Sequence, residues 1–244
     1  MWDWLLAPID PSRGHEVGAL VSWHARTMTL GWGVIAPTAV IAARFFKILP
    51  GQDWPNELDS KIWWRTHLFG QMFAYGLSLI GLLLILFHGA GPEALVHKVL
   101  GFTVLLLGTL QVALGFFRGT KGGPTAPAPD GSLRGDHFDM TPWRLMFERV
   151  HKSIGYLALA LAAFAIISGL WTANAPRWMW LMILGYWGLL VAVSVRMQRM
   201  GRAYDTYQAI WGAHPDLPGN KMKKMGWGTV RPSECARLNK EGKR

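Results

Sequence analysis

Cysteine is almost absent from this sequence: the one copy, Cys235, lies near the C-terminal end. A single cysteine excludes an internal disulfide, a cysteine-ligated iron–sulfur cluster and the C-x-x-C-H motif of covalent haem attachment. Walker, G-x-S-x-G and H-E-x-x-H motifs are absent as well, and GWGVIA at 31–36 lies inside an apolar segment rather than after a strand. The sequence therefore shows no sign of a nucleotide-binding, serine-hydrolase or zinc-protease site.

Charge is also scarce. Charged residues make up 16% of the 244 residues, against about 25% in a typical soluble domain, while 51% are hydrophobic. Several windows of about 20 residues are nearly free of charge, which is the length that a helix needs to cross a bilayer. The sequence predicts an all-α integral membrane protein. Residues 1–17 lack the basic start and unbroken apolar run of a secretory signal, and we expect the first span to direct insertion.

Five membrane spans can be read from the apolar segments. They cover about 18–43, 63–88, 97–117, 151–171 and 178–198, and the third and fourth begin a few residues before these starts. We expect 1–17 to be a short periplasmic segment, 18–200 a five-helix transmembrane domain with an irregular Gly- and Pro-rich loop at 118–142, and 201–244 a basic cytoplasmic tail.

Basic residues are distributed unevenly between the two ends of these spans. When each is assigned to its nearer side, the N-terminal side receives Arg13, Arg26, Lys98 and Arg177, and the other side receives the remaining 21 of 25. The positive-inside rule then places the N-terminus outside and the C-terminus inside, and we expect the inner membrane of a bacterium. Topology and attraction to anionic lipid account for the net charge of +10, and no nucleic acid partner is expected.

Histidine is the ionisable residue that enters the spans. One histidine lies a few residues inside the start of each of the first four spans, and ionisable groups at that depth are costly and indicate function. These four are His24, His67, His97 and His151. Of the other four, His15, His137 and His214 are interpreted as ordinary loop residues. His88 lies at the end of the second span.

The direction of the spans determines which of these histidines can meet. Because consecutive spans are antiparallel, we expect His24 to face His97 near the periplasmic surface and His67 to face His151 near the cytoplasmic surface, roughly 20 Å apart along the membrane normal. Two histidines on facing helices suit a flat metal ring bound from both sides. Zinc requires three or four ligands, and no carboxylate within the spans supplies the others.

Two glycines and one further histidine bear on this interpretation. Gly101 and Gly155 follow His97 and His151 by one helical turn on the same face, where a side chain would occupy the space of a porphyrin. Close helix packing explains these glycines equally well. His88 is an alternative ligand on the periplasmic side, although we favour an outer-sphere or interfacial role because the cytoplasmic side has no third histidine.

The four segments resemble the core of the cytochrome b561 family, most closely that of members carrying DOMON domains. The similar residues are WHARTMTLGWGVIAPTAVIAARFFK (23–47), WWRTHLFGQMFAYGLSLIGLLL (63–84), HKVLGFTVLLLGTLQVALGFFR (97–118) and ERVHKSIGYLALALAAFAIISGL (148–170). The resemblance covers about 20–172 and includes no DOMON domain. It implies two haems b, with the first and third histidines as axial ligands of one iron and the second and fourth of the other.

The resemblance also implies a function. We expect an antiparallel four-helix bundle that holds two haems b, with a fifth, peripheral transmembrane helix. Its expected function is that of a di-haem transmembrane electron-transfer oxidoreductase, with a quinol, an ascorbate-like reductant or a redox protein among its donors and acceptors. A haem-bearing anchor or assembly subunit of a larger membrane redox complex is the alternative. A histidine-lined proton or metal transporter is a weaker interpretation, since it would require acidic partners in the spans.

Basic residues beside the expected haems could neutralise haem propionates or bind an anionic substrate. Arg44, Lys47 and Arg149 are at the level of the cytoplasmic pair, and Arg26 and Lys98 are at the level of the periplasmic pair. Topology and snorkelling explain the cytoplasmic group equally well. Arg26 and Lys98 are more informative because basic residues are scarce on their side.

Overall fold

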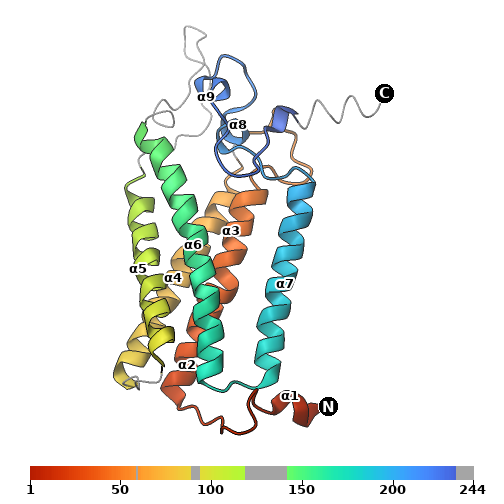
Figure 1. The fold of residues 1–244 in the computed structure, drawn as a ribbon. Helices are drawn as coiled ribbons and strands as arrows, with labels where there is room; N and C mark the ends of the chain where they lie inside the picture. Colours follow the sequence, from red (N-terminus) through yellow and green to blue (C-terminus); the bar gives the residue numbers. More distant parts are fainter. Residues whose placement is uncertain (59, 89–93, 119–141, 235–244) are drawn as a thin grey trace. The chain divides into compact units, whose positions relative to one another are not determined.

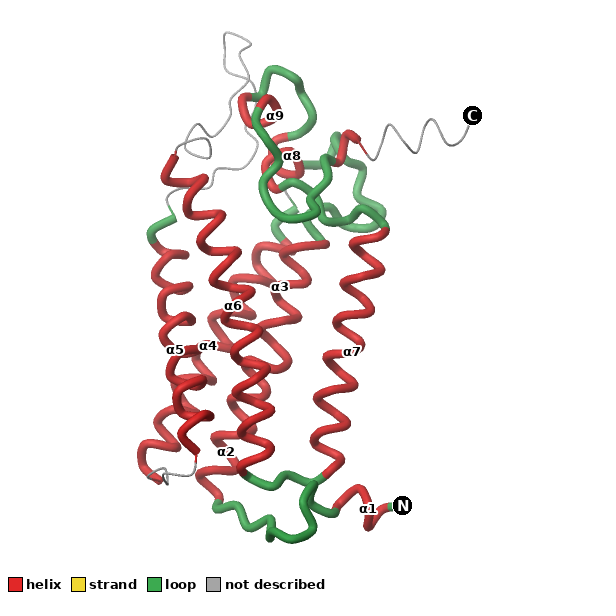
Figure 2. The backbone as a smooth tube through the Cα atoms, in the orientation of Figure 1, coloured by secondary structure: helices red, strands yellow, loops and turns green. Residues whose placement is uncertain are grey.

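The computed structural model describes residues 1–58, 60–88, 94–118 and 142–234. Within these ranges every regular element is a helix, and β structure is limited to two isolated bridges. The elements, shown in Figures 1 and 2, are α1 (Trp2–Leu6), α2 (Ala19–Met28), η1 (Thr29–Ile35), α3 (Ala36–Phe45), α4 (Ile62–His88), α5 (Leu95–Phe116), α6 (Pro142–Thr172), α7 (Arg177–Arg199), α8 (Thr206–Trp211) and α9 (Pro218–Lys221).

Five of these helical segments are long and apolar enough to cross a membrane. They are Ala19–Phe45, Ile62–Phe87, Leu95–Phe116, Pro142–Thr172 and Arg177–Arg199. The all-α integral membrane fold expected from the sequence is confirmed. The fourth segment begins earlier than expected, because α6 continues through Trp143–Val150 before it reaches the apolar stretch. Pro142 is the first residue of α6. Proline is well suited to this position, because the N–H that it lacks would have no partner within the helix.

The first span contains a π-helix, η1, over the sequence TLGWGVI. Gly31 and Gly33 of this segment are buried, and a Cβ atom on Gly31 would lie 2.9 Å from the carbonyl oxygen of Ala74. The indole of Trp187 donates a hydrogen bond to the Gly33 carbonyl (2.9 Å). Gly31 therefore allows α4 to approach the first span, and the carbonyl of Gly33 accepts a hydrogen bond from α7.

The chain divides into two compact units, and each long helix contributes to both. Unit 1 comprises Met1–Ala39, Phe69–Val112 and Ile154–Val193. Unit 2 comprises Val40–Leu68, Ala113–Ser153 and Ser194–Arg244.

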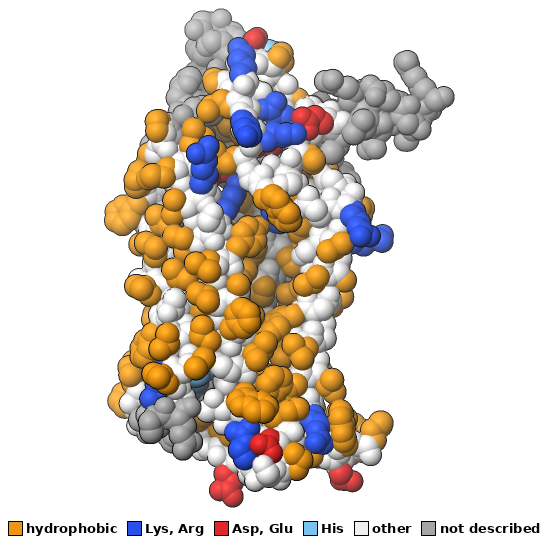
Figure 3. Space-filling view, in the orientation of Figure 1, with side chains coloured by type: hydrophobic (Ala, Val, Ile, Leu, Met, Phe, Trp, Pro, Cys, Tyr) orange, Lys and Arg blue, Asp and Glu red, His pale blue; other side chains and the backbone are white. Residues whose placement is uncertain are grey.

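Small residues fill the interior of unit 1, and large apolar side chains lie outside. Ala36, Ala74 and Ala158 are at most 2% exposed, whereas Leu106 and Met182 are each 68% exposed. Small interior residues permit close helix contacts in a membrane, where lipid solvates the outward side chains. Figure 3 shows hydrophobic side chains along the long helices and Lys and Arg side chains near their ends.

Asn174 joins the N-terminal segment of unit 1 to the turn between α6 and α7 by hydrogen bonds. Its side-chain oxygen accepts from the Asp10 amide (3.0 Å), and its nitrogen donates to the carbonyls of Asp10 (3.0 Å) and Arg13 (2.6 Å). Asn174 has a positive φ of 46°, a backbone conformation that asparagine tolerates better than most residues. Hydrogen bonds from the Ser12 side chain and backbone hold the pKa of the Asp10 carboxyl below its usual value.

Unit 2 has an apolar cluster of its own, formed by α4 and the C-terminal segment. Trp63, Ile210, Trp211 and Leu217 are all at most 7% exposed. Asp205 caps α8 by accepting from the Gln208 amide (3.1 Å), a contact typically worth about 1 kcal/mol. No element is predicted from the sequence in this part of the tail, yet its described residues fold against the end of a membrane helix.

Candidate functional site: two histidine pairs

The first histidine pair lies in unit 1. The ring centroids of His24, from α2, and His97, from α5, are 6.0 Å apart, and the ring planes are inclined by 79°. His24 Nδ1 donates to the carbonyl of Gly81 (2.8 Å), and His97 Nδ1 donates to the carbonyl of Ala165 (2.9 Å). Because a carbonyl can only accept, each Nδ1 carries the proton and each Nε2 keeps the lone pair that a metal needs.

Glycines on α4 and α6 make this arrangement possible. A Cβ atom on Gly169 would lie 2.9 Å from Cε1 of His97, and one on Gly81 would lie 2.7 Å from Oγ1 of Thr27. Real Cβ contacts are essentially never that short, so a larger residue at position 169 would displace the imidazole. The contact of Gly169 with His97 is not predicted from the sequence. A signal was present, however, since Gly115 and Gly169 occupy the same offset from His97 and His151.

The second pair lies in unit 2. The ring centroids of His67, from α4, and His151, from α6, are 6.1 Å apart, and their planes are inclined by 81°. Phe147 stacks on His151 with a centroid separation of 5.1 Å and an interplanar angle of 25°. The Arg144 guanidinium carbon lies 4.8 Å from the Phe147 ring centroid.

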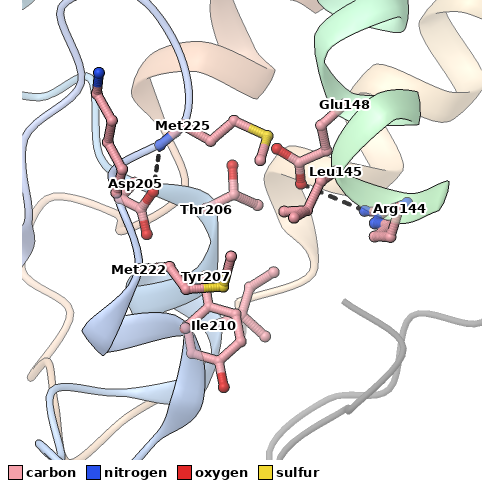
Figure 4. Close-up of a pocket in the computed structure, with 11 residues that line it drawn as sticks. Arg144, Leu145, Glu148, Asp205, Thr206, Tyr207, Ile210, Met222 and Met225 are labelled. Carbon is pink, nitrogen blue, oxygen red and sulfur yellow. Dashed lines mark hydrogen bonds and ion pairs between the residues drawn. The ribbon is translucent and has the colours of Figure 1, made fainter. Parts of the chain in front are cut away.

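Three charged side chains of α6 accompany the second pair. The Glu148 carboxylate binds Lys152 at 2.9 Å and Arg144 at 3.6 Å, as i,i+4 neighbours on a helix can. Arg144 is buried, with 4% of its surface exposed. In Figure 4, Arg144 and Glu148 lie on the α6 side of a pocket, and Asp205, Tyr207 and Met225 of the C-terminal segment lie opposite. Phe147 and Arg144 are parts of the site that are not predicted from the sequence.

Both pairs have the separation that a single metal held between two imidazoles requires. With each nitrogen about 2 Å from the metal, as in other metal–histidine bonds, the ring centroids lie roughly 6 Å apart. Among the described residues no group of three or more His, Cys, Asp and Glu side chains could hold a metal ion. The geometry therefore fits a group that needs two axial ligands, and haem b is such a group.

The two glycines expected to leave room for a porphyrin have different surroundings. A Cβ atom on Gly101 would find nothing within 4 Å, whereas one on Gly155 would lie 3.7 Å from Nε2 of Gln111. Close packing against a neighbouring helix therefore does not explain Gly101. Open space beside it is compatible with a bound ring, and the role of both glycines stays a prediction.

The basic residues predicted near the second pair are placed differently from one another. Arg44 donates to the Gln198 side chain (2.9 Å) and to the carbonyl of Trp227 (2.8 Å), which joins α3 to the end of α7 and to the tail. Lys47 is buried and donates to the Arg44 carbonyl (3.3 Å), whereas Arg149 is exposed. Their role as propionate or substrate contacts stays a prediction.

Two basic residues accompany the first pair. Arg26 is exposed, and its guanidinium lies 5.0 Å from the ring centroid of Trp23, while Lys98 is half-buried. Their predicted contacts with haem propionates or an anionic substrate also remain untested.

The remaining histidines lie away from both pairs or outside the description. His15 contacts the carbonyl of Ala173 (2.8 Å), and His214 lies 3.8 Å from the Asp216 carboxylate. The His88 side chain, His137 and most of the predicted loop 118–142 lie outside the described residues.

Comparison with known proteins finds several related chains. The sequence is 25% identical over 148 residues to a cytochrome b561, DM13 and DOMON domain-containing protein of Arabidopsis thaliana, covering 60% of this chain and 14% of that protein. It is 27% identical over 150 residues to a cytochrome b561 and DOMON domain-containing protein of the same plant, covering 60% and 27%. It is 29% identical over 154 residues to ferric-chelate reductase 1 of Bos taurus, covering 62% and 22%.

These matches span only a minor part of each relative's length. No protein-family model matches the chain, and no solved structure matches it. The cytochrome b561 relatives, which match about 60% of this chain, confirm the resemblance to the cytochrome b561 family that the four histidine-bearing segments had indicated.

Proposed function

We propose that this protein is a b-type cytochrome that carries electrons across a membrane through two haems, one at each histidine pair. The observation that carries the proposal is the geometry of the pairs, whose ring centroids lie 6.0 and 6.1 Å apart. Haem iron supplies the one-electron redox chemistry when it is bound. The relatives named cytochrome b561 support a haem b cofactor, and the number of haems rests on the two pairs.

The protein's own residues have three tasks in this function. His24 and His97 would bind one haem, and His67 and His151 the other. The carbonyls of Gly81 and Ala165 hold the first pair in the tautomer that exposes Nε2. The apolar side chains of the spans would give both haems surroundings of low polarity, because a segment that crosses a bilayer consists mainly of apolar residues.

Donor and acceptor are part of the proposal. A quinol, an ascorbate-like reductant or a redox protein would supply electrons. Relatives from Bos taurus and Xenopus laevis are named ferric-chelate reductase 1 and putative ferric-chelate reductase 1, which makes a ferric chelate a reasonable acceptor to test. We propose that the N-terminus is outside and the C-terminus inside. A bacterial inner membrane stays a prediction, because the relatives are plant and animal proteins.

One alternative has an observation in its favour. The folded C-terminal segment exposes 87% of Trp227, which suits a contact with another subunit of a membrane redox complex. In that case the protein would be a haem-bearing anchor subunit, and purified protein would exchange electrons across a bilayer only after its partner is added.

Transmembrane electron transfer can be measured in liposomes. Purified protein would be reconstituted around trapped ferricyanide, and a membrane-impermeant reductant would be added outside. We expect the trapped ferricyanide to be reduced at a rate proportional to the protein in the membrane. His97→Ala and His151→Ala should each reduce that rate at least tenfold, since each removes an axial ligand on the proposed route.

His214→Ala is the matched control, because this histidine lies in the tail with 53% of its side chain exposed. Its rate should equal that of the parent. A parent rate no higher than that of empty liposomes would contradict electron transfer by this chain alone. Full activity in both ligand variants would contradict the assigned route.

A further inference from the structure

Three residues of α6 share one face of the helix. Arg144, Phe147 and His151 are separated by three and four positions, which places their side chains on successive turns of the same stripe. The structure shows both resulting contacts: Arg144 lies 4.8 Å from the Phe147 centroid, and Phe147 lies 5.1 Å from the His151 centroid. The spacing places the three side chains on one stripe, and the observed contacts join them into a row that ends at a proposed iron ligand.

The Phe147 contact is a stacking contact and restricts how the imidazole can turn. The two ring planes are inclined by only 25°. Rotation of the imidazole about its side-chain bonds would drive its edge into the phenyl face. Phe147 is itself held in place, with 7% of its surface exposed. A buried aromatic ring with so little space keeps its own plane, because protein interiors are closely packed.

Arg144 supports the phenyl ring from the preceding turn. Its guanidinium is buried, with 4% exposed, and a cation beside an aromatic face is attracted by the ring quadrupole. Glu148 contacts Arg144 at 3.6 Å and Lys152 at 2.9 Å, which holds the two cations on one carboxylate. Arg144, the residue of the row that is farthest from His151 in sequence, is therefore held in position by its own contacts.

The unit 1 pair is oriented by different contacts. There His24 and His97 each donate a hydrogen bond through Nδ1 to a backbone carbonyl. A hydrogen bond fixes the direction of the ring nitrogen, whereas a stacked phenyl ring fixes the ring plane directly. The two units thus reach similar interplanar angles, 79° and 81°, by different means.

We propose that Phe147, supported by Arg144, is a positioning residue that sets the plane of the His151 imidazole and thereby the electronic state of one haem only. The proposal rests on the proposed function, since it concerns a haem ligand. The low-spin ferric signal in electron paramagnetic resonance reports the angle between two axial imidazole planes. Loss of the stacking contact therefore has a signature that general destabilisation lacks.

The test compares two substitutions at Phe147. Phe147→Leu keeps an apolar side chain and removes the ring, whereas Phe147→Tyr keeps the ring. We expect Phe147→Leu to shift the signal of the haem that His151→Ala abolishes, to change its midpoint potential, and to leave the other haem's signal unchanged. Phe147→Tyr should restore the parent spectrum. Phe164→Leu is the matched control, because Phe164 lies on the same helix and is 62% exposed; it should leave both signals unchanged.

Each result decides the proposal. Unchanged signals in Phe147→Leu, equal shifts in both haems, or a Phe147→Tyr spectrum as altered as that of Phe147→Leu would overturn it. Should Phe147→Leu fail to fold or lose haem altogether, Arg144→Met provides the second variant, and it must shift the same single signal or the proposal fails. A parent protein without any low-spin haem signal would instead contradict the proposed function, so the two failures are distinguishable.

Discussion

The two histidine pairs have nearly the same internal geometry and very different surroundings. In unit 1 the rings of His24 and His97 are held by backbone carbonyls, and Gly169 makes room for an imidazole. In unit 2 the His151 ring is stacked on Phe147, among three charged side chains of α6. Similar ligand geometry can therefore be built from backbone groups or from side chains, and the two solutions should respond differently to mutation.

The largest expected effect is the loss of a haem when a ligand is removed. His24→Ala or His97→Ala should remove one haem, and the double variant should be little worse than either single one, because a single axial bond seldom retains the ring. His67→Ala and His151→Ala should do the same to the other haem. Pyridine haemochrome analysis of the purified variants measures this.

Combinations taken across the pairs test their independence. His24→Ala with His67→Ala should remove both haems additively, since sites that share no ligand are expected to behave independently. Retention of both haems in His24→Ala, together with loss of one in His88→Ala, would show that the second span supplies the ligand in unit 1. The ligand assignment would then be wrong.

A steric clash introduced at position 169 should affect only the haem of unit 1. Gly169→Ala places a methyl group 2.9 Å from Cε1 of His97, and the imidazole must move. We expect haem content to fall at the unit 1 pair, with the unit 2 signal unchanged in absorption and paramagnetic resonance spectra. Gly185→Ala is the control, because a Cβ atom there meets nothing within 4 Å. Equal haem content in both variants would contradict the close contact.

The apolar cluster of the tail should matter to unit 2. Trp211 is 7% exposed and packs with Trp63, Ile210 and Leu217. Trp211→Ala should lower the free energy of unfolding by about 3–5 kcal/mol, as other large-to-small core changes do. On heating, the haem at His67 and His151 should be released first. Trp227→Ala, at a side chain that is 87% exposed, should leave the melting curve unchanged.

The smallest expected effect is on stability and concerns the surface ion pair between Lys224 and Glu234. A hydrogen bond from Lys224 lowers the pKa of the Glu234 carboxyl from its usual value of 4.5. The ion pair therefore stabilises the folded protein at pH values above the pKa that Glu234 has in the unfolded chain. This stabilisation is lost as the pH falls through the lower pKa that Glu234 has in the folded protein. Glu234 is 45% exposed in its side chain, and screening limits the effect to a few tenths of a kcal/mol. Glu234→Gln should lie slightly below the parent in melting temperature at pH 7, and the difference should shrink as the pH falls below 4.5.

Much of the fold was predictable from sequence because lipid imposes simple requirements. Long charge-free segments must be helices in a bilayer, and this expectation is confirmed by the five helical segments. Antiparallel order then determines which ends of the helices meet, and the structure brings together the two histidine pairs that were expected. Haem ligation by these pairs remains a prediction.

Other features could not be read from the sequence, for physical reasons. A π-helical segment of only seven residues, TLGWGVI, is too short to leave an apolar period of its own that differs from that of the α-helices on either side. The stacking of Phe147 on His151 depends on side-chain rotation, which spacing alone leaves open. The contact between Gly169 and His97 joins different helices and requires their relative height.

The central claim is that each histidine pair binds one haem, and the reduced-minus-oxidised absorption spectrum of the purified protein, with haem counted per chain, tests it most directly. Two imidazole ligands leave no open position on the iron, so we expect a low-spin b-type spectrum, weak binding of carbon monoxide and about two haems per chain. Folded protein that contains no haem after expression with adequate haem supply would contradict the account.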